Sequence, residues 1–366
     1  MRYWGNNRIS VNNHTISYND EGPDETPVII LIHGFPFNKS MWNKQVELLL
    51  ENYRVITYDI RGHGDSEAGT EDFSIGLFAD DLLGLMDYLK IEKAMLCGLS
   101  LGGYIALNAI EKFPKRFDAL VLCDTTCAAD TPETKEKRRI AIENITKYGI
   151  EQYASESIKK LFAPETFITS KEKTLAIKEM IMKTSEQSLT STLLALAART
   201  ETCSKLAQIR MPVLIMVGKE DKITPPSAAR FMQKTIKGST LQVIEHAAHL
   251  SNIENPYEFN QNLLKFVSSF NHRPDNFRNG DRLGFELRNS DKTSKYEEMK
   301  KDLNAKILKM TMTIKNKYPE LSKYLDEMPD TIPDEKDTEI TLKNLSTYYG
   351  SLNSILKKYK STHPAR

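Results

Sequence analysis

The residues best suited to chemistry lie in the run Cys97-Gly-Leu-Ser-Leu-Gly-Gly103. This run directly follows an apolar stretch typical of a buried strand, and it precedes a helical pattern that ends near Lys112. A G-x-S-x-G motif between a strand and a helix is the context in which a serine is held on a sharp turn as a nucleophile. The glycines are needed because a Cβ close to the serine would clash there. The helix that follows points free N–H groups at the negative charge that develops in acyl transfer. Ser100 is therefore the predicted nucleophile.

A serine nucleophile needs a base, because its hydroxyl is scarcely ionised near neutral pH. Position separates the histidines: those in the first hairpin, in early loops before glycines and near the C-terminal end are unsuited to this role, namely His14, His33, His63, His272 and His363. His33 and His63 are expected to make local hydrogen bonds. His246 and His249 remain, in the loop after the last predicted strand. We favour His249, which lies further from the strand end and can reach a serine on a neighbouring strand.

The base in turn needs a carboxylate that fixes its tautomer. Glu220 and Asp221 follow the penultimate predicted strand, and Asp124 ends an earlier one. We favour Asp221, because the chain order then becomes Ser, Asp, His, as expected for a strand–elbow–helix nucleophile of this kind. Asp124 and Glu220 stay open as alternatives.

Two backbone N–H groups are predicted to form an oxyanion hole. One belongs to Leu101, directly after the nucleophile. The other belongs to Phe35 in the run His33-Gly-Phe-Pro36, where Gly34 frees the backbone and the proline cannot donate. Phe37 and Trp42 could line a substrate pocket, together with Leu193, Leu194 and Leu196 from a helical segment later in the chain. It is equally consistent with the sequence that all of these residues are simply part of the core.

The elements that must position these residues alternate along the chain. Strands are predicted at 28–32, 54–58, 94–97, 119–123, 213–217 and 241–244, after a hairpin over 8–20 with a turn at Asn12-Asn13. Helices are predicted at 40–51, 75–89, 101–112, 227–236 and 257–270. Continuous apolar strands alternating with helices indicate an α/β domain, here 1–271, with a mostly parallel sheet covered on both faces. Residues of about 128–211 show helical spacing without a strand, which predicts a helical cap over the carboxyl edge of the sheet.

The C-terminal part differs in character. Residues 272–292 are polar, contain glycine and proline, and are predicted to be a linker. Within 293–366, apolar residues recur at three- and four-residue steps from Tyr296 to Ile314 and again from Leu342 to Tyr359. This pattern predicts a small α-helical hairpin that either packs on the α/β domain of its own chain or mediates self-association or contact with a protein partner.

Composition narrows the functional classes. The chain has 366 residues, 40% of them hydrophobic and 27% charged, and a net charge of +1. This balance gives no reason to expect nucleic acid or an anionic membrane as partner, and no run is long and apolar enough for a membrane span. The four cysteines, Cys97, Cys123, Cys127 and Cys203, form neither a C-x-x-C pair nor a metal-binding pattern. We therefore expect reduced thiols, a cytoplasmic location and no metal.

Taken together, these motifs resemble the α/β-hydrolase superfamily over residues 8–271. The resemblance rests on His33-Gly-Phe-Pro36, Asp59-Ile-Arg-Gly-His-Gly-Asp-Ser66, Gly98-Leu-Ser-Leu-Gly-Gly103, Gly218-Lys-Glu-Asp-Lys-Ile-Thr-Pro225 and His249-Leu-Ser-Asn-Ile-Glu-Asn-Pro256, in that order. Within the superfamily the chain looks most similar to small carboxylesterases and 3-oxoadipate enol-lactonase-like hydrolases, and the run from Asp124 to Glu133 adds to that similarity. The C-terminal hairpin has no counterpart in this resemblance.

The resemblance implies an eight-stranded, mostly parallel sheet, a helical cap and no cofactor. It also implies a serine hydrolase that cleaves a small-molecule carboxylic ester or lactone through an acyl-enzyme. Two alternatives remain open. The same triad could serve carbon–carbon bond hydrolysis or perhydrolysis, or the protein could be a slow-turnover ligand sensor that signals through the cap or the hairpin.

Overall fold

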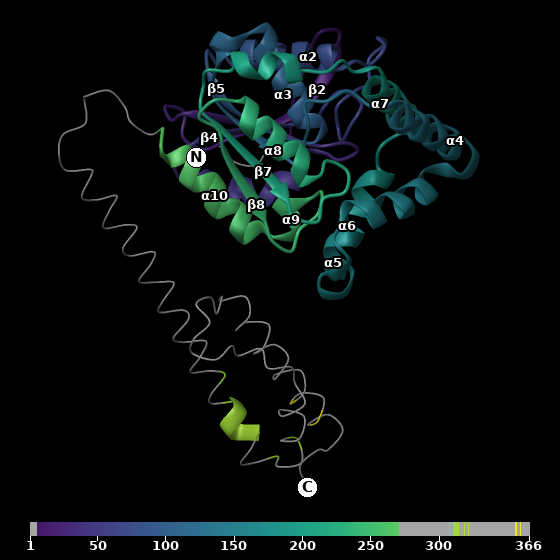
Figure 1. Cartoon of the computed structure of the whole chain (residues 1–366), viewed down its shortest axis with the longest axis vertical. Helices are drawn as coiled ribbons and strands as arrows, with labels where there is room; N and C mark the ends of the chain where they lie inside the picture. The colour runs from purple at the N-terminus through teal and green to yellow at the C-terminus, as the bar shows by residue number, and fades with distance from the viewer. Residues whose placement is uncertain are drawn as a thin grey trace, which may run out of the picture. The chain divides into compact units, whose positions relative to one another are not determined.

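The computed structural model describes residues 6–270 and, from the C-terminal part, residues 307, 310–314, 318, 321, 356 and 359. The chain divides into two compact units, Met1–His272 and Arg273–Arg366 (Figure 1). The predicted linker 272–292 and most of the predicted hairpin 293–366 lie outside the described residues. The structure describes a few residues of the predicted hairpin. Three of them are buried, Ile307, Ile314 and Leu356, and the rings of Tyr318 and Tyr359 pack edge to face with centroids 5.6 Å apart.

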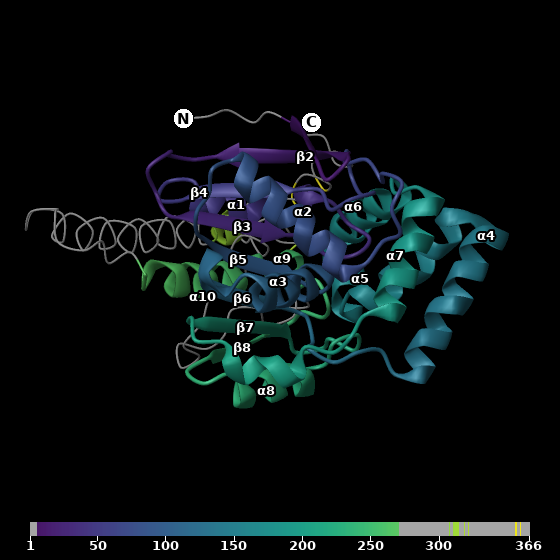
Figure 2. The ribbon, with the colours of Figure 1, turned by 90° about the horizontal axis from the view of Figure 1, so that it is seen from above.

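The first unit is built on one eight-stranded sheet in the order β1-β2-β4-β3-β5-β6-β7-β8. β1 pairs with β2 and β2 with β4 in antiparallel fashion, and the other neighbours are parallel. The strands are β1 Asn7–Val11, β2 His14–Glu21, β3 Val28–Ile32, β4 Arg54–Tyr58, β5 Ala94–Leu99, β6 Phe117–Cys123, β7 Val213–Gly218 and β8 Thr240–Ile244. The mostly parallel sheet expected from the sequence is thus confirmed, and Figure 2 shows the strands side by side.

Helices cover both faces of the sheet, because alternate residues of each strand point to opposite sides. On one face, α2 (Ile75–Tyr88), α3 (Leu101–Lys112) and α8 (Pro226–Thr235) pack on residues such as Ile30 and Leu96. On the other, α1 (Asn43–Leu49) and α10 (Pro256–Ser268) pack on residues such as Ile29 and Met95. Short helices complete the unit: η1 Lys39–Trp42, η2 Pro114–Arg116 and α9 Ser251–Glu254.

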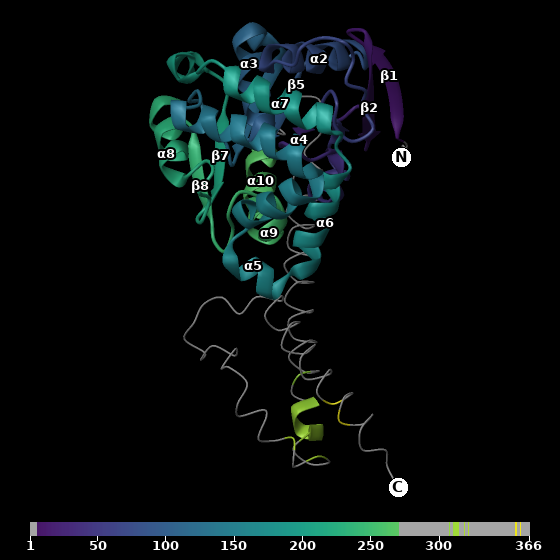
Figure 3. The same ribbon diagram turned by 90° about the vertical axis from the view of Figure 1, so that its right-hand side faces the viewer.

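Between β6 and β7 the chain forms the predicted cap. It consists of α4 (Pro132–Leu161), α5 (Pro164–Thr169), α6 (Lys171–Met182) and α7 (Glu186–Ala198), followed by η3 (Cys203–Gln208). These helices gather beyond one end of the strands (Figure 2), and α4 and α7 lie in front of the sheet when the unit is viewed from that end (Figure 3). Local signals start them: Thr131 and Ser185 accept hydrogen bonds from backbone N–H groups in the first turns of α4 and α7. Gly149, at φ 82° and ψ 171°, interrupts α4 with a kink.

One expectation about the cysteines is wrong. Cys127 and Cys203 form a disulfide, so only Cys97 and Cys123 are free, and both are buried. The paired cysteines are 76 residues apart, at the entry and the exit of the cap. Their proximity depends on the path of the chain through the cap and back to β7, which sequence spacing alone does not reveal. Within the described residues, no helix is both long and apolar enough to cross a membrane.

Candidate active site

Ser100 occupies a sharp turn between β5 and α3, as the sequence predicts. Its backbone lies at φ 52° and ψ −110°, a conformation that costs energy for a residue with a Cβ. Close contacts between backbone segments explain the glycines around it. A Cβ on Gly102 would lie 2.2 Å from the carbonyl oxygen of Ile32, and one on Gly98 would lie 2.3 Å from that of Gly102. The Ser100 N–H donates to Cys123 O at 2.9 Å, which ties the turn to β6.

The fold brings Ser100, His249 and Asp221 together from three separate loops. His249 Nε2 lies 2.9 Å from Ser100 Oγ, and His249 Nδ1 lies 2.9 Å from Asp221 Oδ2. All three residues are buried, with Ser100 retaining 8% exposure. The alternative base, His246, is exposed and instead pairs with Glu165 at 3.1 Å.

A dense set of donors holds Asp221 in place. Its Oδ1 accepts from the N–H groups of Ile223 at 2.8 Å and Thr224 at 3.0 Å, and its Oδ2 accepts from Thr224 Oγ1 at 2.7 Å. Burial by itself raises the pKa of Asp221, but the facing charge of His249 and these hydrogen bonds outweigh it, so the pKa lies below its usual range. Thr224 was not singled out from the sequence, although a threonine three residues after an aspartate is a recognisable local turn pattern.

Asp124, the rival acid, has different partners. Its carboxylate accepts from Gly218 N at 2.8 Å and from Ser251 Oγ at 2.5 Å, so it joins the end of β6 to the end of β7 and to α9. It is fully buried, and burial together with the charge of Asp221 raises its pKa. Glu220, the other alternative, is exposed. Among the three candidate acids, Asp221 is the one hydrogen-bonded to His249.

The electrostatics of His249 suit a base. Burial lowers the pKa of His249, but the negative charges of Asp221, Asp124 and Glu254 and the hydrogen bond to Asp221 raise it further than burial lowers it. The net pKa therefore lies above its usual value of 6.5. A raised pKa increases the affinity of the imidazole for the proton that a serine would release.

The loop after β3 carries Phe35, the predicted second oxyanion donor. Neither Phe35 N nor Leu101 N donates a hydrogen bond to another residue within 6–270. Gly34 lies against the end of β5, since a Cβ there would be 3.2 Å from Leu99 O. His33 fixes the start of the loop: its Nδ1 donates to Gly34 O at 2.8 Å and its Nε2 accepts from Ile60 N at 2.9 Å. Burial lowers the pKa of His33 well below its usual value, in keeping with this neutral tautomer.

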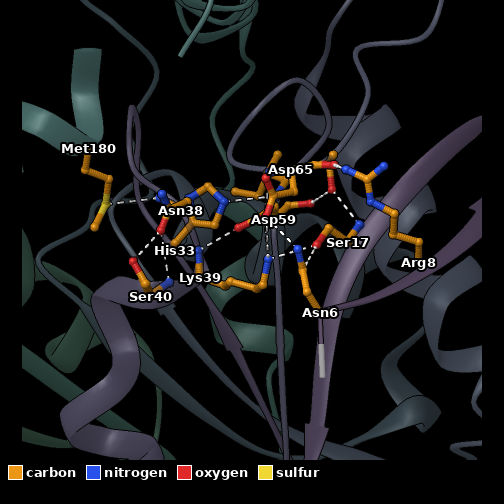
Figure 4. A network of polar contacts seen from close by, with 12 residues as sticks. Asn6, Arg8, Ser17, His33, Asn38, Lys39, Ser40, Asp59, Asp65 and Met180 are labelled. Carbon is orange, nitrogen blue, oxygen red and sulfur yellow. Dashed lines mark hydrogen bonds and ion pairs between the residues drawn. The ribbon is translucent and has the colours of Figure 1, made fainter. Parts of the chain in front are cut away.

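A polar network secures the far end of the same loop (Figure 4). Lys39 Nζ lies 2.6 Å from Asp59 Oδ2, and Asp59 Oδ1 accepts from Lys39 N at 2.8 Å. Asn38 N donates to Met180 Sδ of α6 at 3.3 Å, which connects the loop to the cap. The loop is thus fixed on both sides of Phe35.

Phe37 and Trp42, the predicted pocket residues, expose no surface to a substrate in this structure. Both are fully buried in the core on the α1–α10 face of the sheet, where the ring of Trp42 lies 6.2 Å from that of Phe259. Of the cap leucines, Leu193 and Leu196 are also buried, whereas Leu194 is 60% exposed.

Comparisons with known proteins agree with this architecture. A family model described as alpha/beta hydrolase fold matches residues 27–256. The chain belongs to this family. A 3-oxoadipate enol-lactonase from Acinetobacter baylyi is 33% identical over 257 residues, which are 70% of this chain and 94% of the relative.

Solved structures show the same likeness. A thermophilic esterase from Thermogutta terrifontis aligns with a TM-score of 0.69 at 32% identity, over 72% of this chain and 98% of the esterase. The enol-lactonase from Burkholderia xenovorans LB400 aligns with a TM-score of 0.68 at 28% identity, over 72% of this chain and all of the enol-lactonase. This α/β hydrolase is therefore similar to both lactonases and esterases.

Proposed function

We propose that this α/β hydrolase cleaves a carboxylic ester or lactone by acyl transfer to Ser100. The observation that carries the proposal is the chain of two 2.9 Å contacts from Ser100 Oγ through His249 to Asp221. The similarity to an enol-lactonase and to an esterase supports the substrate class.

In the first half of the reaction, Ser100 Oγ attacks the carbonyl carbon while His249 Nε2 accepts the hydroxyl proton. Asp221 holds Nδ1–H and stabilises the imidazolium. The N–H groups of Phe35 and Leu101 donate to the oxyanion, and the helix α3 directs its N-terminal end toward the same charge. The intermediate collapses when His249 returns the proton to the leaving alkoxide, which gives an alcohol and an acyl-enzyme.

In the second half, His249 takes a proton from water as the water oxygen attacks the acyl carbonyl. Collapse of this intermediate restores the Ser100 hydroxyl and leaves a carboxylic acid. With a lactone, the alcohol and the acid belong to one product molecule, because the leaving oxygen stays tethered to the acyl group.

Labelling with a fluorophosphonate probe tests the nucleophile. We expect one adduct, which mass spectrometry maps to Ser100, and none in Ser100→Ala. The matched control is Ser155→Ala, since Ser155 is a half-buried cap serine whose hydroxyl donates within α4, to Glu151 O at 2.9 Å. Hydrolysis of p-nitrophenyl acetate should fall by at least about 10⁴-fold in Ser100→Ala and stay unchanged in Ser155→Ala. An adduct elsewhere, or activity that survives in Ser100→Ala, contradicts the proposal.

A substrate panel separates the chemistries that share this nucleophile. Esters of increasing acyl length and simple lactones should be hydrolysed, with lower rates for carbon–carbon substrates and for peracid formation from hydrogen peroxide. Preference for a carbon–carbon substrate or for perhydrolysis would keep Ser100 as nucleophile and replace the ester or lactone assignment.

A further inference from the structure

Glu254 is a buried carboxylate that bonds to two segments far apart in the sequence. It ends α9 and is 4% exposed. Its Oε1 accepts from Ala248 N at 2.7 Å, directly before His249. Its Oε2 accepts from Ala163 N at 2.8 Å and from Thr166 Oγ1 at 2.6 Å, both in the cap. A single side chain therefore joins the loop of the base to the start of α5.

Further hydrogen bonds and an ion pair join the cap to the loop that carries His249. The backbone N–H of His249 donates to Leu161 O, at the end of α4, at 3.0 Å. Lys173 Nζ of α6 donates to the backbone carbonyl of Glu254 at 3.1 Å, and the exposed pair of His246 and Glu165 lies at 3.1 Å. Cap residues 161–173 thus contact the loop 246–254 on both sides of His249, whereas Ser100 and Asp221 are positioned by the sheet domain.

The carboxylate form fits this place better than any neutral side chain. The groups that bond to its oxygens are all donors, and hydrogen bonds to a charged acceptor are about twice as strong as neutral ones. A glutamine of the same size can satisfy only one side. Its amide nitrogen would face either Ala248 N or the cap donors, and a buried donor would be left without an acceptor. Burial raises the pKa of Glu254, and its hydrogen bonds oppose that shift.

We propose that Glu254 is a positioning residue that fastens the loop of His249 to α5, so that the imidazole is aligned with Ser100 only while this part of the cap is seated. The proposal rests on the proposed function of Ser100 and His249. Glu254 itself touches no reacting atom. It transmits the position of the cap to the base through Ala248.

Three full-length variants test this role. Glu254→Gln removes the charge at constant size. Thr166→Val removes only the cap hydroxyl. Thr169→Val is the matched control, because Thr169 lies on the same helix but its hydroxyl donates to Glu165 O, at 3.1 Å, and not to Glu254. We expect kcat for p-nitrophenyl acetate to fall about 100-fold in Glu254→Gln and about 3- to 10-fold in Thr166→Val, with KM within about twofold, and Thr169→Val to match the wild type.

The pH profile distinguishes positioning from a merely structural role. The negative charge of Glu254 raises the pKa of His249, as do those of Asp221 and Asp124. The acid limb of kcat/KM should therefore move to lower pH in Glu254→Gln and stay in place in Thr166→Val. Equal loss of kcat in Thr166→Val and Thr169→Val would overturn the proposal even if Glu254→Gln did not fold.

Two further measurements do not depend on turnover, so they separate this proposal from the proposed function. In nuclear magnetic resonance, the amide of His249 should exchange with solvent at least about tenfold faster in Glu254→Gln, and the pKa of its imidazole should fall. Neither should change in Thr169→Val. A wild type that hydrolyses nothing would sink the proposed function alone. An unchanged His249 amide and pKa in Glu254→Gln would sink the role of Glu254 alone.

Discussion

On the sheet side of Ser100, backbone lies directly against backbone. Gly98 and Gly102 have no room for a Cβ, the Ser100 N–H bonds to β6, and Asp221 is held by N–H groups of its own turn. On the cap side, the loop of His249 meets α5 through the side chains of Glu254 and Thr166 and through one backbone bond to Leu161. The kink at Gly149 lies in open space, with nothing within 4 Å of an added Cβ. The nucleophile and the acid are thus fixed by main-chain packing, whereas the loop of the base is held partly by side-chain and backbone bonds to the cap.

The largest expected effect separates the two buried aspartates of the sheet side. Asp221→Asn should lower kcat/KM about 10⁴-fold with little loss of stability, because it removes the acceptor that holds the tautomer of His249. Asp124→Asn should lower the free energy of unfolding by about 1–3 kcal/mol, through its bonds to Gly218 and Ser251, with a far smaller loss of activity. Ester hydrolysis and urea unfolding measure the two effects. The reverse pattern would make Asp124 the functional acid.

The second prediction compares glycines of the two regions. Gly102→Ala should lower the free energy of unfolding by about 4 kcal/mol or more, since its Cβ would meet the backbone of β3. Gly149→Ala should cost about 1–2 kcal/mol, because φ of 82° strains a residue with a Cβ while the space around it is open. Urea denaturation of both variants decides. Equal losses in the free energy of unfolding would contradict the difference in backbone packing between the sheet side and the cap.

A third test loosens the cap at its base. The double substitution Cys127→Ser and Cys203→Ser should lower the free energy of unfolding by about 2–4 kcal/mol, because the disulfide joins residues 76 positions apart in the chain. Serine at the free Cys97 is the control for thiol loss in the sheet core. Denaturation with and without a reductant measures the difference. A reductant that leaves the wild type unaffected would argue against the bond.

The smallest effect concerns pH. His249 acts as a base only when neutral, and its pKa lies above 6.5, so kcat/KM should fall about tenfold per pH unit below that value. Burial and the charge of Asp221 raise the pKa of Asp124 to about 8, so Asp124 is largely neutral over this limb, and Asp124→Asn should leave the limb in place. Initial rates across pH 5–9 measure the position of the limb. A limb that moves to lower pH in Asp124→Asn would mean that Asp124 carries its negative charge beside His249.

The strands and the turn that carries Ser100 could be predicted well from the sequence, for a physical reason. The strands from β3 to β8 are apolar runs that fall where predicted. The glycines of the G-x-S-x-G run indicate a tight turn that has no room for a Cβ. The residues favoured from the sequence, Ser100, His249 and Asp221, are the three that the fold brings into contact, although chain order alone does not separate Asp221 from the alternative acids.

Contacts between segments far apart in the chain could not be predicted from the sequence. The Cys127–Cys203 bond and the cap bonds of Glu254 depend on the folded cap, whereas the bonds of Asp124 depend on the neighbouring ends of β6, β7 and α9. No local sequence pattern encodes any of these contacts. Phe37 and Trp42 show the same limit, because aromatic type alone does not distinguish a pocket wall from a core residue.

The way the cap joins the sheet domain has a consequence for how such proteins diversify. The Cα atoms of Cys127 and Cys203 are 4.8 Å apart, so the whole insertion leaves and returns at one point beside β6 and β7. A different helical segment, or a short turn, could be grafted between these two positions without moving either strand. Such a graft would leave Ser100 and Asp221 in place on the sheet domain, but it would remove the cap residues that bond to Glu254 and to the backbone of His249.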